Sequence, residues 1–161
     1  MPASFVAVDP CSGEFAGIHA ASGASRREAL DPIRQGVSRH FGALERRVVA
    51  QGLVLRHDHG SNCMSGDFQR EIRFLGMTSS PAFVRQPEGN GVAERAIRTL
   101  KEQLLWVLPS ATVEELRLAL GAFAVLYHAS WLRERHGHRA AVQRMQSIKM
   151  LQDRRCRKLR R

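Results

Sequence analysis

The pattern of apolar and polar positions predicts strands in two regions of the chain. Residues 4–9 and 15–20 are short β-prone runs separated by a turn-like segment, and together they predict a hairpin. Residues 53–58 form an apolar run that ends in charge, which is typical of a buried strand in an α/β protein. Residues 77–84 predict one more strand, which Pro81 weakens because proline cannot donate a ladder hydrogen bond.

Helical signals follow these strands along the chain. Ser25 is a candidate N-cap for a helix over residues 26–42, which Pro32 and Gly36 are expected to interrupt. Ser65 is the candidate cap of a short helix over residues 65–76.

The longest apolar pattern lies in the second half of the chain. From Gly91 to Leu108 apolar residues recur at helical spacing, and Pro109 ends that helix. Thr112 and Glu115 form a capping box that opens another helix, expected to reach about Arg135. Strands that alternate with helices predict an α/β domain with helices packed on a mixed sheet.

The net charge of +10 is concentrated at the C-terminal end of the chain. Residues 139–161 hold nine Lys or Arg and one acid, a net of +8, whereas residues 1–138 hold 16 basic and 14 acidic residues, a net of +2. We therefore expect one domain over residues 1–138 and a basic, helical tail over residues 139–161. Two interpretations of the tail stay open: a contact with a polyanion, or a solvated basic terminus.

Composition also excludes several classes of protein. No apolar run reaches the roughly 18 residues that a membrane span needs, and the N-terminus has no signal pattern, so we expect a cytoplasmic protein without a membrane partner. The three cysteines include no Cys-x-x-Cys pair, so neither a disulfide framework nor a zinc ribbon is expected. Two histidine pairs, His57 with His59 and His136 with His138, are more simply hydrogen-bonded or surface residues than zinc ligands.

Two carboxylates carry the candidate chemistry. Asp58 ends the predicted strand at residues 53–58, where ligand sites of α/β sheets gather, and Glu94 lies on the first turn of a long helix. Carboxylates that meet at such a place suit Mg²⁺ or Mn²⁺, and two such ions promote phosphodiester chemistry. For either acid alone, a charge at a helix N-terminus or a solvated loop acid is the competing interpretation.

A set of short motifs gives these acids a common context. Over about residues 4–145 the chain resembles the integrase-type catalytic core of bacterial insertion-sequence transposases, which are relatives of retroviral integrases. One part of the resemblance is the separation of 35 residues between Asp58 and Glu94. The other part is a series of motifs: His57-Asp58-x-Gly60-Ser61, Phe74-Leu75-Gly76, Ser80-Pro81-Ala82, Pro87-Glu88-Gly89-Asn90-Gly91, Ala93-Glu94-Arg95 and Leu100-Lys101-Glu102.

The resemblance implies a ribonuclease H-like fold, in which helices flank a five-stranded mixed sheet. It implies DNA integration by metal-dependent cleavage and strand transfer, with Asp58 and Glu94 as the second and third catalytic acids and as ligands of Mg²⁺ or Mn²⁺. The implied partners are double-stranded DNA, at transposon ends and target, and further copies of the chain or a full-length transposase, so the protein would associate with the nucleoid. No Ser, Tyr or Cys nucleophile is needed, in agreement with the lack of a convincing triad in the sequence.

Candidate DNA contacts are basic or polar residues near Glu94 and in the tail. Lys101 follows Glu94 on the same helical face, where it contacts a phosphate or is simply solvated. The other candidates are Asn90, Arg95, Arg98, Arg154, Arg155, Arg157 and Lys158. Trp106 and Trp131 lie at helical positions and are expected in the core rather than as base-stacking platforms.

One part of the family pattern is missing from the sequence. The family's first catalytic acid lies on a central first strand, before the hairpin, whereas Met1 lies inside or just before the second strand. Asp9 matches the Asp of the hairpin turn, so the first acid and the central strand are expected to be absent. The hairpin and the strand ending at Asp58 must then pair directly or leave backbone groups unpaired. We therefore expect a truncated transposase core, or one with a misplaced start, that is inactive alone; the alternative is a non-catalytic DNA-binding or oligomerising remnant.

Overall fold

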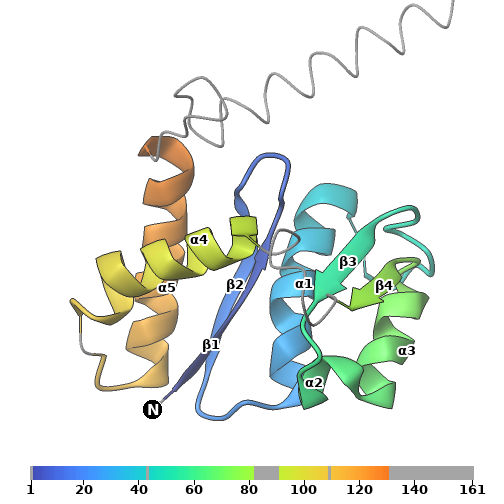
Figure 1. Cartoon of the computed structure of the whole chain (residues 1–161), viewed down its shortest axis with the longest axis horizontal. Coiled ribbons are helices and arrows are strands. Elements are labelled where there is room, and N and C mark those ends of the chain that lie inside the picture. The colour runs from blue at the N-terminus through green and yellow to red at the C-terminus, as the bar shows by residue number, and fades with distance from the viewer. Residues whose placement is uncertain (1, 43, 82–90, 109, 131–161) are drawn as a thin grey trace, which may run out of the picture.

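The computed structural model describes residues 2–42, 44–81, 91–108 and 110–130. Within these residues, four strands and several helices follow one another in a mixed α/β order (Figure 1). The first two strands form the predicted hairpin: β1 (Ala3–Val8) pairs antiparallel with β2 (Phe15–Ala21). This order of elements confirms the predicted α/β class.

Helix α1 (Arg26–Phe41) packs on this hairpin and ends one residue before the predicted end at residue 42. The Ser25 hydroxyl accepts a hydrogen bond from the Glu28 amide and caps the helix, as expected. The expected interruption at Pro32 is wrong, because the helix continues through it. Pro32 is buried against β2, where a Cβ added to Gly17 would lie 1.9 Å from the Pro32 carbonyl oxygen. This close contact stabilises a helix that has lost one backbone donor.

The third and fourth strands form a second, smaller unit. Strand β3 (Val54–His57) pairs parallel with β4 (Thr78–Pro81). Between them lie α2 (Ser61–Met64) and α3 (Gly66–Phe74), and the Ser65 hydroxyl caps α3 by accepting from the Phe68 amide. The strand and helix predicted here are confirmed up to Pro81; residues 82–84 lie outside the described residues.

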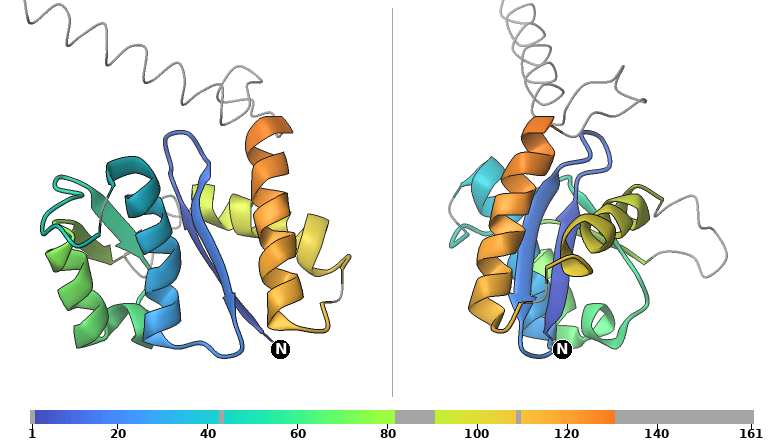
Figure 2. Two further views of the ribbon diagram at one scale, coloured as in Figure 1. Left: turned by 180° about the vertical axis from the view of Figure 1, so that it is seen from behind. Right: turned by 90° about the vertical axis from the view of Figure 1, so that its left-hand side faces the viewer.

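The two strand pairs do not join into one sheet in the described part of the chain. β1 pairs with β2 and β3 pairs with β4, with no ladder between β1 and β3. In Figure 1 the two pairs stand apart, and the view from behind in Figure 2 shows α1 in front of the space between them. The hairpin and β3 therefore do not pair directly among the described residues, and the lack of a central strand stays a prediction.

Because of this open edge, the prediction that the strand at residues 53–58 is buried is wrong. Val54 is 62% exposed and Leu53 is 37% exposed. Among the four residues of β3, His57 alone is buried. The apolar run has the composition of a central strand, but one of its two edges has no neighbouring strand, so its side chains face an open space.

The second half of the chain builds a helical layer on the hairpin. Helix α4 (Gly91–Leu100) continues into one π-helical turn, η2 (Lys101–Leu105), and α5 (Val113–Ser130) follows. The predicted capping box forms: the Thr112 hydroxyl accepts from the Glu115 amide, and a Glu115 carboxylate oxygen accepts from the Thr112 amide. The predicted extension of α5 to Arg135 lies outside the described residues.

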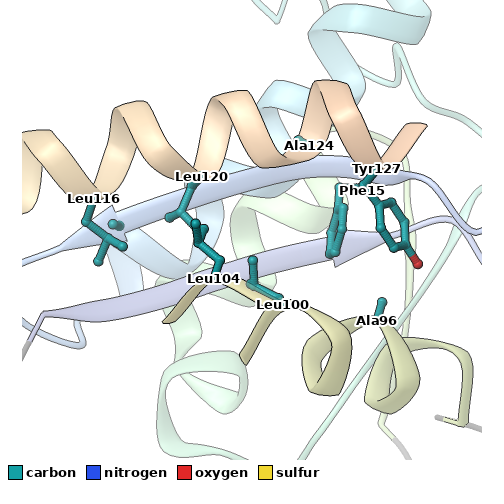
Figure 3. Packing of buried hydrophobic residues seen from close by; sticks show 9 residues of the cluster. Phe15, Ala96, Leu100, Leu104, Leu116, Leu120, Ala124 and Tyr127 are labelled. Carbon is teal, nitrogen blue, oxygen red and sulfur yellow. The ribbon is translucent and has the colours of Figure 1, made fainter. Parts of the chain in front are cut away.

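One hydrophobic core lies between these helices and β2. Figure 3 shows Leu116, Leu120 and Tyr127 of α5 on one side and Leu100 and Leu104 on the other, with Phe15 of β2 beside Tyr127. The Phe15 and Tyr127 ring centroids are 4.8 Å apart. A second core lies under α1 and α3, where Leu30, Val37, Phe68, Ile72 and Leu75 pack together. The described residues therefore form two separate buried clusters.

Trp106 corrects a sequence prediction, because it is 71% exposed instead of lying in the core. The cause is the π-helical turn that ends at Leu105, since its wider turn contains an additional residue. That residue rotates the following positions away from the apolar face, so Leu104 is buried while Trp106 and Val107 are exposed. Trp131 lies outside the described residues.

Candidate metal and nucleic-acid site

Asp58 is positioned by the end of β3 and by the loop that follows it. Its Oδ1 accepts a hydrogen bond of 2.9 Å from the Gly60 amide, and the residue is exposed. A Cβ added to Gly60 would lie 2.8 Å from this oxygen, so a larger residue there would displace the Asp58 carboxylate. The loop therefore holds the Asp58 side chain at the carboxyl end of a strand, as the sequence predicts.

Glu94 lies on the first turn of α4 and is exposed. Its negative charge is favourable there, because the unpaired amides at a helix N-terminus carry partial positive charge. Glu94 and Asp58 line the same cavity, which has a volume of about 700 Å³. Two acids separated by 35 residues in the sequence are thus brought to one space by β3 and α4.

Asp9, by contrast, does not line that cavity. Its side chain is engaged in its own turn, where it accepts hydrogen bonds from the Cys11 amide, the Ser12 amide and the Ser12 hydroxyl. Burial raises the pKa of Asp9, but the Ser12 hydroxyl, the two amides and the charge of His40 outweigh this effect and leave the pKa below its ordinary value of 3.8. The structure therefore confirms Asp9 as a turn residue, as the sequence indicates.

His57 is buried at the base of the site. One ring nitrogen lies 2.7 Å from the Asp58 carbonyl oxygen and the other lies 2.8 Å from the Ser79 hydroxyl oxygen. Because both nitrogens are engaged, the interpretation of His57 as a hydrogen-bonded residue is confirmed. These bonds also tie the backbone of Asp58 to β4. His59 is exposed, and the pair His136 and His138 lies outside the described residues.

Cys63 is a neighbour of Asp58 that sequence reasoning did not connect to the site. Burial, the negative charge of Asp58 and a hydrogen bond to Asp58 raise the pKa of the Cys63 thiol to about 11. At neutral pH the Cys63 group is therefore a thiol and not a thiolate. No pattern in the sequence signals this contact, since Cys63 lies on α2, five residues after Asp58.

The basic candidates near Glu94 that the structure describes are all exposed. Arg95 and Arg98 lie on α4, and Lys101 begins the π-helical turn. π-Helical turns are frequent at functional sites. The remaining candidates lie outside the described residues: Asn90, Arg154, Arg155, Arg157 and Lys158.

A second cluster of potential ligands lies away from this cavity. His19 of β2 approaches two carboxylates of α1, with its Nε2 at 2.6 Å from a Glu28 oxygen and 3.3 Å from an Asp31 oxygen. None of the three lines the cavity of Asp58 and Glu94. These contacts join β2 to the first turns of α1.

His128 is a structural residue that the sequence did not reveal. The Phe15 amide, at the start of β2, donates a hydrogen bond of 2.9 Å to His128 Nε2 at the end of α5. The two residues are 113 positions apart, so no local pattern indicates this contact. It ties the last turn of α5 to the hairpin beside the Phe15–Tyr127 ring contact.

Comparisons with known proteins agree with this arrangement. No family model matches the chain. Among curated relatives, an IgE-binding protein of Mus musculus is 29% identical over 125 residues, which are 76% of this chain and 21% of that protein. The putative transposase InsD for insertion element IS2E of Escherichia coli K12 is 27% identical over 104 residues, which are 64% of this chain and 46% of that protein. The chain thus spans less than half the length of both relatives.

Solved structures show the fold. The catalytic core domain of BIV integrase has a TM-score of 0.64 at 20% identity and covers 90% of this chain and 86% of its own. The catalytic core domain of HTLV-2 integrase, solved in complex with magnesium in a trimeric form, has a TM-score of 0.55 at 18% identity and covers 84% of this chain and 79% of its own. The chain therefore has the fold of an integrase-type, ribonuclease H-like catalytic core.

Proposed function

We propose that the chain is the catalytic core of a transposase or integrase, an enzyme that cleaves and joins DNA phosphodiesters. The observation that carries the proposal is the meeting of Asp58 and Glu94 at one cavity, at the end of β3, in a fold shared with integrase cores. The similarity to a putative transposase supports the same function. The position of Asp58 at the carboxyl end of a strand suits a ligand site in an α/β fold.

The donor set of this cavity fits a hard divalent cation. Asp58 and Glu94 would hold it through carboxylate oxygens, as Mg²⁺ and Mn²⁺ prefer. When bound, such an ion stabilises the charge that develops on phosphate oxygens and activates an attacking oxygen. Gly60 fixes the Asp58 carboxylate, and His57 fixes the backbone that carries it.

In the proposed complex the exposed face of α4 meets DNA. Arg95, Arg98 and Lys101 lie close in sequence to Glu94, so a phosphate backbone bound to them would pass near the carboxylates. The solved neighbours include an intasome of simian T-cell lymphotropic virus with a TM-score of 0.56 at 19% identity, which covers 76% of this chain and 41% of its own. We propose double-stranded DNA and further copies of the chain as partners, by analogy with such assemblies.

A second candidate function rests on the composition of the cavity. Among the described residues that line it, Asp58 and Glu94 are the two that carry carboxylates. Two carboxylates hold a divalent cation more weakly than three, because each lost ligand is replaced by water. A chain with this site binds DNA or joins an assembly without catalysing strand transfer. Activity and metal binding must therefore be measured separately.

Metal binding is tested by titrating the protein with Mn²⁺ and following the free ion by electron paramagnetic resonance. We expect Asp58→Asn and Glu94→Gln each to weaken Mn²⁺ binding at least about tenfold, since each removes one of two anionic ligands. Asp67→Asn is the matched control, because Asp67 is a half-exposed carboxylate paired with Arg26 at 2.9 Å and does not line the cavity. Equal Mn²⁺ binding by all variants would overturn the proposed site.

Catalysis is tested with the same proteins on supercoiled plasmid DNA in Mg²⁺ or Mn²⁺, with nicking and strand joining as the readouts. The proposed catalytic function predicts metal-dependent nicking or strand joining by the 161-residue chain, whereas the second candidate predicts DNA binding without either. Robust metal-dependent activity that Glu94→Gln abolishes would show that two acids suffice. DNA binding that persists in Asp58→Asn and Glu94→Gln, without activity in any protein, would favour the second candidate.

A further inference from the structure

Three potential metal ligands gather where β2 meets the first turns of α1. His19 Nε2 lies 2.6 Å from a Glu28 oxygen and 3.3 Å from an Asp31 oxygen, and the ligand atoms of the three residues all lie within 4.8 Å of one another. Figures 1 and 2 show α1 beside β2. We call these three residues the β2–α1 triad. None of them lines the cavity of Asp58 and Glu94.

The backbone that carries the triad is closely packed. A Cβ added to Gly17 of β2 would lie 1.9 Å from the Pro32 carbonyl oxygen of α1. Glu28 and Asp31 are three residues apart on α1, so their side chains leave the same face of the helix. The His19 side chain is 14% exposed, whereas those of Glu28 and Asp31 are 32% and 37% exposed. Burial therefore fixes the imidazole, and the two carboxylates give an ion a path from solvent.

Glu28 is turned away from the contact that its position in the helix favours. Ser25-x-x-Glu28 at the start of α1 is a capping-box pattern, like Thr112-x-x-Glu115 at the start of α5. In α5 the Glu115 carboxylate accepts a hydrogen bond from the Thr112 amide. In α1 the Glu28 carboxylate contacts the His19 ring instead. The triad thus takes a carboxylate that would otherwise complete a helix cap.

The charge of the triad favours a cation. Two carboxylates meet one imidazole, and the neighbouring Arg34 places its Nη1 3.9 Å from an Asp31 oxygen. Arg34 contacts Glu71 more closely, at 3.0 Å through Nε and 2.9 Å through Nη2, so Glu71 balances most of its charge. A proton shared by His19 and Glu28 is the competing occupant, since charge-assisted hydrogen bonds are about as short as their 2.6 Å contact.

We propose that the β2–α1 triad binds one Zn²⁺ ion through His19 Nε2 and one oxygen each of Glu28 and Asp31, with water as the fourth ligand. The imidazole nitrogen selects Zn²⁺ over Mg²⁺, which prefers oxygen ligands. Tetrahedral Zn²⁺ holds nitrogen and oxygen ligands at about 2.0–2.1 Å, so neighbouring ligand atoms are about 3.3 Å apart. His19 and Asp31 already have this separation. The Glu28 oxygen must move about 0.7 Å away from His19, which its partly exposed side chain allows.

The bound ion joins the hairpin to α1. The unfolded chain does not hold the three ligands together, so Zn²⁺ binds the folded state preferentially and stabilises it. The inference does not rest on the proposed function, because no ligand of the triad belongs to the cavity of Asp58 and Glu94.

The first experiment titrates Zn²⁺ calorimetrically into the 161-residue chain carrying Asp58→Asn and Glu94→Gln, so that the candidate catalytic carboxylates do not contribute. We expect His19→Gln and Asp31→Asn, each added to this protein, to weaken Zn²⁺ binding at least about tenfold, since each removes one of three ligands. Zn²⁺ should also raise the unfolding temperature of the protein with the intact triad and not that of these two variants. Mg²⁺ at the same concentration should have no effect.

His40→Gln is the matched control for the loss of a histidine. The His40 ring also contacts a carboxylate, that of Glu14, at 2.8 Å, and its side chain is 26% exposed. This variant should bind Zn²⁺ as tightly as the protein with the intact triad. Equal Zn²⁺ binding with and without His19 would overturn the proposal and place the ion elsewhere on the chain.

The second experiment needs no substitution in the triad, so it holds even where a variant does not fold. NMR of nitrogen-labelled imidazole distinguishes a metal-bound Nε2 with a protonated Nδ1 from an imidazolium that carries protons on both nitrogens. We expect saturating Zn²⁺ to give the metal-bound form of His19. A proton that remains on Nε2 at saturating Zn²⁺ would overturn the proposal in favour of a proton alone. Nicking activity and Mn²⁺ binding at Asp58 and Glu94 do not enter these readouts, so failure of the proposed function is a separate result.

Discussion

Asp9 and Asp58 are both aspartates that directly follow a strand, yet their hydrogen bonds give them different roles. The carboxylate of Asp9 accepts three hydrogen bonds inside its own turn. The Oδ1 of Asp58 accepts one from Gly60, and its carboxylate faces a cavity that Glu94 shares. An aspartate whose oxygens are used by local amides stabilises a turn, whereas Asp58, which is contacted by the Gly60 amide and the Cys63 thiol, keeps acceptor positions for other ligands.

The first prediction concerns the pH dependence of Asp9. Because its folded-state pKa lies below the ordinary value of 3.8, ionised Asp9 stabilises the fold above about pH 4, and this contribution is lost as the pH falls through the folded-state pKa. We expect Asp9→Asn to lower the free energy of unfolding by about 1–2 kcal/mol at pH 7, since charged hydrogen bonds in a half-buried turn are lost. Urea unfolding at pH 7 and pH 3 measures the difference.

The control for this prediction is Ser12→Ala. It removes one donor to Asp9 but leaves the carboxylate, so it should cost less than Asp9→Asn at pH 7. A destabilisation by Asp9→Asn that is as large at pH 3 as at pH 7 would show that the effect is not electrostatic.

At the scale of elements, the contact between β2 and α1 decides how the hairpin meets the rest of the chain. Gly17 of β2 lies against the backbone of Pro32, and Gly36 of α1 lies against Ala16. Pro32 and Gly36, which the sequence predicts to interrupt α1, are therefore the residues that let α1 approach β2. Pro32 and Ile33 of α1 also line the cavity that Asp58 and Glu94 share, so this contact positions one wall of the candidate site.

The second prediction tests this approach with Gly17→Ala. The added Cβ would lie 1.9 Å from the Pro32 carbonyl oxygen, so β2 and α1 must separate. We expect a loss of more than about 3 kcal/mol in the free energy of unfolding, as for severe overpacking of a core. Gly23→Ala is the matched control, since no heavy atom lies within 4 Å of its added Cβ. Thermal unfolding of both variants gives the comparison, and equal stability of the two would contradict the proposed contact.

The π-helical turn shows where sequence reasoning failed at this scale. The apolar spacing from Gly91 to Leu108 correctly predicts α4 and the buried Leu100 and Leu104. It cannot reveal the additional residue in the turn at η2, because the spacing of apolar residues assumes 3.6 residues per turn throughout. Trp106 and the residues after it are therefore exposed against expectation.

At the scale of the whole molecule, two buried clusters both contact the hairpin, but they contain different side chains. Leu120 belongs to the core between α5 and β2, whereas Ile72 belongs to the core between α1 and α3. The cavity of about 700 Å³ is lined by both β1 and β3, which belong to different strand pairs.

The third prediction follows from this division. Ile72→Val should cost about 0.5–1.5 kcal/mol and Leu120→Ala about 2–5 kcal/mol of unfolding free energy. Because the two side chains lie in separate clusters, the double variant should equal their sum within about 0.5 kcal/mol. Urea unfolding of the two single variants and the double variant measures the coupling.

A pair of substitutions inside one core provides the comparison for this experiment. Phe68 packs in the same cluster as Ile72, so Phe68→Leu combined with Ile72→Val should deviate from additivity. A coupling between Ile72 and Leu120 as large as this internal one would contradict two separate cores.

No helix in the described parts of the chain is long and apolar enough to span a membrane. This finding agrees with the sequence, where no long apolar run occurs. The division into residues 1–138 and a basic tail stays a prediction, because residues 131–161 lie outside the description.

The sequence alone determined the elements and the two acids, because strand and helix periods, caps and residue spacing are local properties. The hairpin, the Ser25 and Ser65 caps, the capping box at Thr112 and the spacing of Asp58 and Glu94 all belong to this class.

Only the tertiary structure decided which distant residues and strand edges lie side by side. Local patterns do not record which strand edges face each other. Packing therefore decides the separation of β1 from β3, the exposure of Val54 and the cavity that Asp58 and Glu94 share. The contact of His128 with Phe15 across 113 positions has the same origin. The periods of strands and helices are local properties of the sequence, whereas contacts between distant residues depend on how the two clusters pack around one hairpin.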